Sequence, residues 1–137
     1  MNRKIEKIIV HCAATPPSMD IGVDVIRKWH IEDRKWSDVG YHYVVRLDGS
    51  IELGRPISRQ GAHTKGYNRE SIGICYVGGV NEKGAAEDTR TDEQKKSLRI
   101  LLEFLKLTFP DSVIHRHRDF ANKACPSFDA TEEYKDL

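Results

Sequence analysis

Three groups of side chains in this sequence have the chemistry of zinc ligands. His11 ends a short apolar run, His115 and His117 flank Arg116, and Cys125 follows eight residues after His117. Imidazole nitrogen and thiolate sulfur are common zinc ligands, and a site with three protein ligands leaves a fourth position open for water. An open site is typical of catalysis, because the metal makes that water a nucleophile near neutral pH. The spacing lacks a tight ligand pair, so both histidines that flank Arg116 remain candidates.

The segments around these residues include several predicted strands. Residues 8–10 are β-branched and end at His11, and residues 71–77 have apolar side chains on both faces, as a central strand does. Asp48-Gly49 lies between two strand-like runs and predicts a β-hairpin turn. The predicted strands cover residues 8–10, 41–47, 50–53, 71–77 and 112–114.

Two helices are also predicted. Residues 23–34 repeat apolar side chains with helical period, and Asp20 is the expected N-cap of this helix. Thr91 and Gln94 have the spacing of a capping box, and a long helix should follow them and end at Pro110. The apolar face of this second helix consists of Leu98, Leu101, Leu102, Leu105 and Phe109.

Length and composition fit one globular domain. The chain has 137 residues, and 22 Lys and Arg against 21 Asp and Glu give a net charge of +1, so no attraction to nucleic acid is expected. No run approaches the roughly 20 apolar residues that cross a bilayer, so we expect no membrane insertion. Strands interspersed with two helices predict a single α/β domain over residues 1–137, with a central mixed sheet flanked by helices. The polar segment 81–90 is expected to be exposed.

The N-terminal segment and the remaining cysteines have simpler interpretations. Residues 1–7 carry charges where a signal peptide needs an apolar stretch, which predicts synthesis in the cytoplasm without a signal peptide. Cys12 and Cys75 lie in strand-like runs, so we interpret both as buried packing residues. Trp29 and Trp36 are likewise interpreted as core or rim packing residues rather than as platforms for sugar binding.

Four motifs occur in an order that resembles a known family. Together they closely resemble the zinc-dependent N-acetylmuramoyl-L-alanine amidases of the phage-lysozyme type, whose domain peptidoglycan recognition proteins share. The resemblance runs from about Ile8 to Asp129 and implies the peptidoglycan recognition protein-like amidase fold. The motifs are His11-Cys12-Ala13-Ala14-Thr15, Asp38-Val39-Gly40-Tyr41-His42-Tyr43, Gly66-Tyr67-Asn68-Arg69-Glu70-Ser71-Ile72-Gly73-Ile74 and Lys123-Ala124-Cys125-Pro126-Ser127-Phe128-Asp129.

The resemblance implies roles for individual positions. His11, His117 and Cys125 match the zinc ligands of the family, which favours His117 over His115 and implies one zinc ion per chain. Tyr41 matches the catalytic tyrosine of the family.

Two further positions take their roles from the same resemblance. Lys123 matches the catalytic lysine, and its positive charge suits it to stabilising an oxyanion. The phenol of Tyr41 can donate a hydrogen bond to the oxyanion or relay a proton, and the sequence leaves the division of these roles open. The polar loop 63–68 is expected to border the muropeptide groove, with His63 as the substrate contact.

The implied function is hydrolysis of the amide bond between N-acetylmuramic acid and L-alanine of the stem peptide. We expect a monomeric phage or prophage endolysin that acts on the cell wall after release or export. The sequence leaves a protein partner, including a phage RNA polymerase, unknown.

Two alternatives belong to other functional classes. A non-catalytic peptidoglycan-binding module typically lacks the cysteine ligand, so Cys125 favours catalysis. A structural zinc protein needs a fourth protein ligand, and Cys12 is the nearest candidate. As the strand neighbour of His11, however, Cys12 should point to the opposite face of the sheet.

Overall fold

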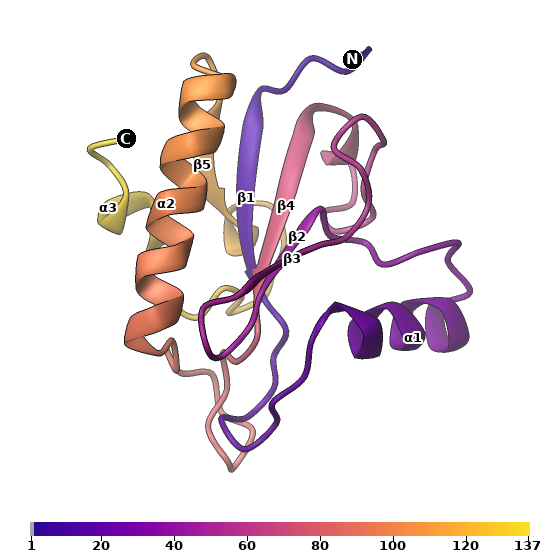
Figure 1. The fold of residues 1–137 in the computed structure, drawn as a ribbon, viewed down its shortest axis with the longest axis vertical. Helices are drawn as coiled ribbons and strands as arrows, with labels where there is room; N and C mark the ends of the chain where they lie inside the picture. Colours follow the sequence, from indigo (N-terminus) through magenta and orange to yellow (C-terminus); the bar gives the residue numbers. More distant parts are fainter. Residues whose placement is uncertain (1) are drawn as a thin grey trace.

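The structure is a computed structural model that describes residues 2–137. One mixed sheet holds five strands in the order β3-β2-β4-β1-β5 (Figure 1). Strands β2, β4, β1 and β5 are parallel to one another, and β3 pairs antiparallel with β2. The bounds are β1 Lys7–Cys12, β2 Tyr43–Val45, β3 Ile51–Leu53, β4 Ser71–Tyr76 and β5 Val113–Arg116. The predicted central position of 71–77 and the hairpin are therefore confirmed.

Helices lie on both sides of the sheet. The long helix α2, Asp92–Thr108, runs along one face of the sheet. Helix α1, Val23–Arg34, lies away from α2, near the ends of β1 and β4 (Figure 1). A four-residue helix, α3, spans Ala130–Glu133 and lies on the α2 side. Two short 3₁₀ turns span Asn68–Glu70 and His117–Asp119. The predicted α/β class with a mixed sheet between helices is confirmed.

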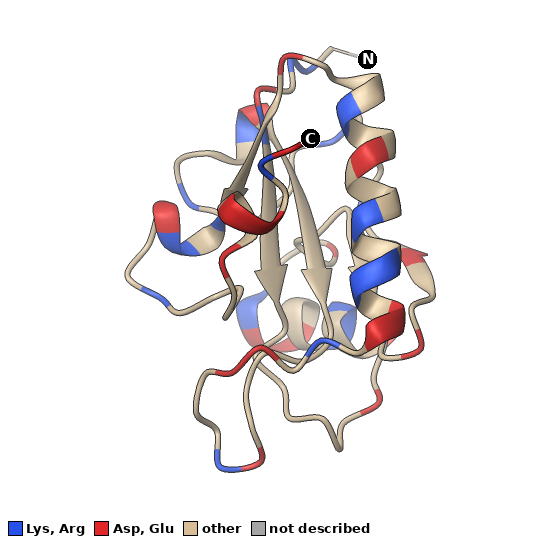
Figure 2. Cartoon of the chain, turned by 90° about the vertical axis from the view of Figure 1, so that its left-hand side faces the viewer, with Lys and Arg blue, Asp and Glu red and all other residues tan. Residues whose placement is uncertain are grey.

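Alternation along the strands divides the core into two clusters. Ile8, Val10 and Cys12 of β1 join the larger cluster beneath α2, while Val44 of β2 joins the smaller cluster beneath α1. Because successive strand residues point to opposite faces, His11 lies on the face away from α2. Figure 2 shows the charged residues on helices and loops, with the central strands nearly free of them.

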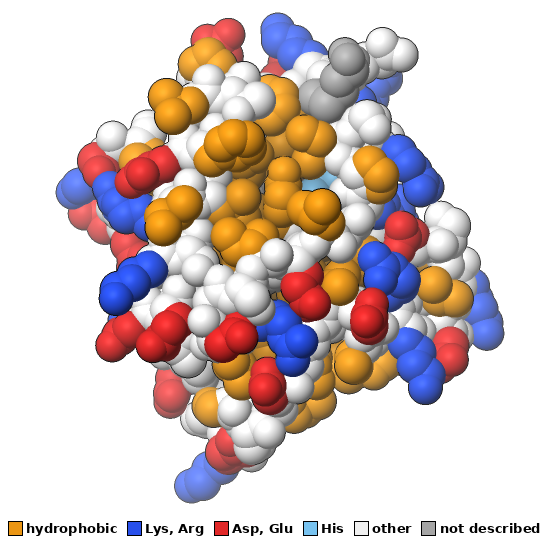
Figure 3. Space-filling model, viewed as in Figure 1, with side chains coloured by type: hydrophobic (Ala, Val, Ile, Leu, Met, Phe, Trp, Pro, Cys, Tyr) orange, Lys and Arg blue, Asp and Glu red, His pale blue; other side chains and the backbone are white. Residues whose placement is uncertain are grey.

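The α2 face also carries exposed apolar side chains, which gather on and beside the helix in Figure 3. This apolar surface lies on the opposite face of the sheet from the His11 side chain. The exposed large apolar residues of α2 and β3 are Ile100, Phe104, Leu107, Ile51 and Leu53.

The start of α2 follows the local sequence signal. Thr91 Oγ1 accepts a hydrogen bond from the Gln94 backbone N–H at 3.1 Å, and Gln94 Oε1 accepts one from the Thr91 N–H at 2.9 Å. The amide of Gln94 is fully buried and donates to the Val77 carbonyl at 2.8 Å. The predicted capping box is thus confirmed, and it also attaches the helix to the end of β4.

The expected N-cap of α1 was wrong. Gly22 occupies the N-cap position, and the Val23 N–H donates to Glu52 Oε1 of β3 at 2.8 Å. Asp20 is 70% exposed at its side chain and pairs with Arg46 instead. A Cβ at Gly22 would lie 2.4 Å from the Glu52 carboxylate, so glycine makes room for this distant cap.

The segment 81–90 is polar and largely exposed as predicted, but Arg90 departs from that expectation. Its side chain is 1% exposed and forms ion pairs with Asp88 at 2.9 Å and Glu133 at 2.7 Å. The guanidinium lies 3.4 Å from the centre of the Phe128 ring. Arg90 therefore fastens α3 to the loop that precedes α2.

Across residues 2–137, none of the helices has the length and apolarity needed to span a bilayer.

Candidate metal centre and substrate cleft

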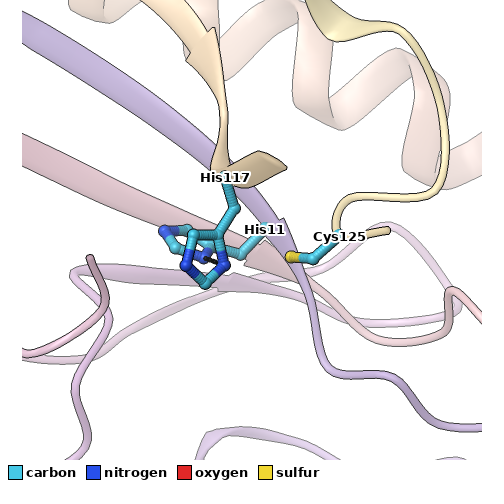
Figure 4. A group of neighbouring side chains, drawn as sticks. All are labelled: His11, His117 and Cys125. Atoms are coloured by element: carbon cyan, nitrogen blue, oxygen red, sulfur yellow. Dashed lines mark hydrogen bonds between the residues drawn. The ribbon is translucent and has the colours of Figure 1, made fainter. Parts of the chain in front are cut away.

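His11, His117 and Cys125 converge at the end of the sheet where β1 and β5 finish. One potential ligand atom from each lies within 4.8 Å of the other two. Parallel pairing of β1 with β5 brings the carboxyl ends of these strands together, and Cys125 returns from the following loop. Figure 4 shows the Cys125 sulfur directed toward the two imidazoles.

The spacing of these atoms suits a tetrahedral metal. His11 Nδ1 lies 3.1 Å from His117 Nδ1. Zinc binds imidazole nitrogen at roughly 2 Å, which separates two such ligands by about 3.3 Å in a tetrahedron. The donor set, two imidazoles and one thiol, therefore fits zinc. His115 lies outside this cluster, because its ring faces Asp119 at 3.7 Å and packs against Phe120.

Both histidines of the cluster are neutral at neutral pH. Burial lowers the pKa of His11 well below its ordinary value, with further lowering from His63, His117 and Lys123. Burial and the charge of Lys123 lower the pKa of His117 to about 4. Neutral imidazole is the form that binds metal, so both histidines keep a nitrogen lone pair that can bind a metal ion.

The pKa of Cys125 is shifted in the opposite direction from those of the two histidines. Its hydrogen bond with Cys12, together with burial, raises the pKa of the Cys125 thiol. The backbone N–H of Cys12 donates to Cys125 Sγ at 3.1 Å, and a bound cation favours the thiolate. The Cys12 side chain itself lies in the larger core cluster, on the face opposite His11, as predicted.

Tyr41 and Lys123 flank the cluster. The Tyr41 ring centre lies 5.1 Å from that of His11. Burial raises the pKa of Tyr41 well above its ordinary value, so it remains a phenol that can donate a proton. Cys75 is fully buried, as predicted.

A cleft of about 550 Å³ opens beside the cluster and is bordered by both His117 and Lys123. Its charged lining residues are Arg34, Lys65 and Lys123, all cationic. Trp36 also lines this cleft, with the Arg34 guanidinium 5.2 Å from its ring centre, which agrees with its interpretation as a rim packing residue. Trp29 packs against the smaller core cluster, as predicted.

His63 lies in the wall of the cleft and is only 9% exposed. Its Nδ1 lies 2.9 Å from His11 Nε2, and its Nε2 lies 3.3 Å from Ser71 Oγ. Burial, followed by nearby histidine and arginine groups, lowers the pKa of His63 well below its ordinary value. The sequence singled out His63 as a loop residue but gave no signal for its contact with His11.

The fold and the cluster of imidazole, thiol, phenol and ammonium groups are those expected of a hydrolase with a candidate metal site, and comparison with known proteins assigns its family. The chain belongs to the N-acetylmuramoyl-L-alanine amidase family, which matches residues 1–128. It is an amide hydrolase of peptidoglycan, and curated relatives with similar sequences are phage endolysins. The predicted family and activity are thus confirmed.

The similarity covers most of the relatives as well as most of this chain. The endolysin of Enterobacteria phage T3 is 49% identical over 124 residues, which cover 90% of this chain and 82% of the relative. The amidase LysC from Clostridium intestinale URNW has a TM-score of 0.82 and 30% identity, covering 98% of this chain and 85% of that one. Bumblebee PGRP-SA, at 23% identity and a TM-score of 0.80, covers all of this chain and 89% of its own; it supports the fold alone.

Proposed function

We propose that the chain hydrolyses the amide between N-acetylmuramic acid and L-alanine with one zinc ion held by His11, His117 and Cys125. The observation that carries this proposal is the convergence of the three ligand atoms within 4.8 Å at the side of a substrate-sized cleft. When bound, zinc polarises a carbonyl and lowers the pKa of water toward neutrality.

Tyr41 and Lys123 are proposed to act on the reacting amide. Attack on its carbonyl carbon places negative charge on the oxygen, and the departing amine of L-alanine needs a proton. The ammonium of Lys123 stabilises the negative charge from the rim of the cleft. The neutral hydroxyl of Tyr41 donates a hydrogen bond to the same oxygen or passes a proton onward.

The lining of the cleft supports an anionic substrate. Arg34, Lys65 and Lys123 supply positive charge, and the cleft has no acidic lining residue among those described. Stem peptides carry carboxylates, so these cations complement a muropeptide. His63 forms part of the wall, which fits the substrate contact proposed from the sequence.

At the level of the whole chain, we propose a single-domain monomer that acts on the cell wall after release or export. Phage endolysins among its relatives support this site of action. The function does not require a nucleic acid or a membrane, and the protein's net charge of +1 agrees with that.

Metal analysis tests the zinc requirement directly. The purified chain should contain one zinc per molecule by elemental analysis, lose its activity on peptidoglycan when a chelator removes the metal, and regain it when zinc is restored. Full hydrolysis by metal-free protein would contradict the proposed role of zinc.

A further inference from the structure

The motif that runs from Gly66 to Ile74 packs around one side chain, His63. Asn68 Oδ1 accepts hydrogen bonds from the backbone N–H groups of His63 and Thr64, both at 2.9 Å. Ser71 Oγ lies 3.3 Å from His63 Nε2. These contacts fix both the loop that carries His63 and one edge of its ring.

Gly73 completes the setting of His63. A Cβ at Gly73 would lie 2.5 Å from ring carbons of His63, closer than side chains approach one another. The imidazole therefore rests directly on the backbone of β4, and glycine is needed at Gly73 for this close approach rather than for a special backbone angle. The motif thus serves to place a buried imidazole.

The other edge of the His63 ring faces the candidate ligand cluster, specifically His11. His63 Nδ1 lies 2.9 Å from Nε2 of His11, and the Thr64 hydroxyl lies 3.3 Å from the same nitrogen. His11 is fully buried. Its Nδ1 faces His117 Nδ1 at 3.1 Å, so its two nitrogens have separate partners on opposite sides.

Proton placement follows from this arrangement. A neutral imidazole that binds metal through Nδ1 must carry its proton on Nε2. The Nε2–H of His11 then donates to Nδ1 of His63, and His63 must carry its own proton on Nε2, which faces Ser71. With Nδ1 of His11 on the metal, each hydrogen bond from His11 through His63 to Ser71 has one donor and one acceptor, which assigns one tautomer to each ring. The Thr64 hydroxyl, 3.0 Å from His63 Nδ1 and 3.3 Å from His11 Nε2, can accept from His11 or donate to His63 without changing either tautomer.

We propose that His63 is a positioning residue, which accepts the proton of His11 Nε2 and thereby keeps Nδ1 of His11 free and directed at the metal. The inference rests on the proposed zinc site. Partners that receive the second N–H of a ligand histidine orient the ring, and their loss typically weakens metal binding about 10–100-fold. Here the acceptor is a neutral imidazole held by β4.

A pair of variants tests the acceptor. In His63→Asn the amide oxygen takes the place of Nδ1 and still accepts a hydrogen bond, whereas His63→Leu fills similar space and accepts none. Zinc affinity is measured without substrate, by competition with a chelating dye, and His30→Asn serves as a control at a half-buried histidine outside the ligand cluster. We expect His63→Leu to bind zinc about 10–100-fold more weakly than the wild type, with His63→Asn and His30→Asn within a few-fold of it.

Imidazole ¹⁵N shifts of the zinc-loaded wild type give a readout that does not depend on whether a variant folds. We expect protonated Nε2 in both His11 and His63 and unprotonated Nδ1 in His63. A proton on His63 Nδ1 would overturn the inference. Equal zinc affinity in His63→Leu and the wild type, or equal weakening in His63→Leu and His63→Asn, would overturn it too.

The same experiments distinguish a failure of the positioning role of His63 from a failure of the proposed zinc site. A wild-type chain that binds no zinc overturns the proposed metal site and the positioning role with it. A wild type and a His63→Leu variant that bind zinc equally tightly overturn the positioning role alone. In that case, a raised KM in His63→Leu would assign His63 to substrate contact only.

Discussion

In the proposed zinc site, His11, His117 and Cys125 would contribute unequally to metal binding, because only the cysteine can bring a negative charge to the metal. Burial keeps both imidazoles neutral, and the backbone N–H of Cys12 stabilises the sulfur. In the proposed site, the Cys125 thiolate would therefore balance part of the charge of the zinc ion.

This inequality gives a prediction for Cys125→Ser. The variant should lose zinc and activity, since a neutral hydroxyl is a poorer zinc ligand than thiolate. Elemental analysis of the purified variant measures the metal. Cys12→Ser is the matched control and should keep its zinc, because the backbone N–H that contacts Cys125 remains. Full zinc occupancy in Cys125→Ser would contradict the assignment of Cys125 as a ligand.

Tyr41 and Lys123 should affect the reaction without affecting the metal. Tyr41→Phe and Lys123→Ala are each expected to retain zinc and to lose about 10²–10³-fold in kcat, the usual effect of removing an oxyanion donor. Steady-state rates on peptidoglycan, with metal content measured on the same samples, provide the test. Near-normal kcat in both metal-loaded variants would remove them from the mechanism.

The sequence was informative about these residues because ligand and reactive groups are recognised by type and motif. Residue type could not reveal that His63 contacts His11, because the contact depends on the backbone of Gly73 lying beneath the imidazole. The placement of the Tyr41 ring 5.1 Å from the His11 ring likewise depends on how distant segments pack together. Such contacts come from tertiary placement that local patterns do not encode.

At the scale of elements, the two main helices begin in different ways. Thr91 and Gln94 cap α2 from within four residues, whereas α1 takes its cap from Glu52 on β3. A local motif was therefore sufficient to predict the start of α2. The carboxylate at α1 comes from about 30 residues away, so the sequence pointed instead to the nearby Asp20. The short helix α3 escaped prediction because four residues show no periodicity.

The distant cap gives a prediction about stability. Glu52→Ala should lower the free energy of unfolding by about 1 kcal/mol, because it removes the carboxylate that accepts from the Val23 N–H. Asp20→Ala should change it little, since Asp20 is exposed and only pairs with Arg46. Urea denaturation of both variants measures the difference. A larger loss in Asp20→Ala than in Glu52→Ala would restore Asp20 as the cap.

At the scale of the whole molecule, buried histidines make stability depend on pH. His42 is 1% exposed, accepts from the Gly73 N–H at 3.0 Å and pairs with the Arg59 carbonyl at 2.8 Å. Burial lowers the pKa of His42 from its ordinary 6.5 to about 4. On acidification, His42 is therefore protonated in the unfolded chain before it is protonated in the folded one. The free energy of unfolding is greatest above pH 6.5 and falls as the pH drops toward 4.

His42 alone should account for about 3 kcal/mol of this loss between pH 7 and pH 4. Denaturant unfolding of metal-free protein at several pH values measures it, with His42→Gln as the comparison. The variant should be less stable at pH 7 but show a shallower loss on acidification. Parallel curves for the two proteins would contradict the assignment of this pH dependence to His42.

The parallel sheet explains why residues far apart in the chain form one site. Strands β1 and β5 end side by side, so His11 and His117 meet although 106 positions separate them. The order of strands and helices allowed the fold class to be predicted, and the motifs allowed the ligand set to be proposed. The cationic lining of the cleft emerges only when the end of α1 and two loops are brought together.

Identifying the bond that is cut is the most direct test of the proposed amidase activity. Purified peptidoglycan is digested with the wild-type protein and, as a control, with Cys125→Ser, and the products are separated and identified by mass spectrometry. We expect free stem peptides that begin with L-alanine, glycan strands that stay long, and no release by the control or in the presence of a chelator. New reducing sugar ends, with peptides still attached to muramic acid, would contradict the proposed amidase activity.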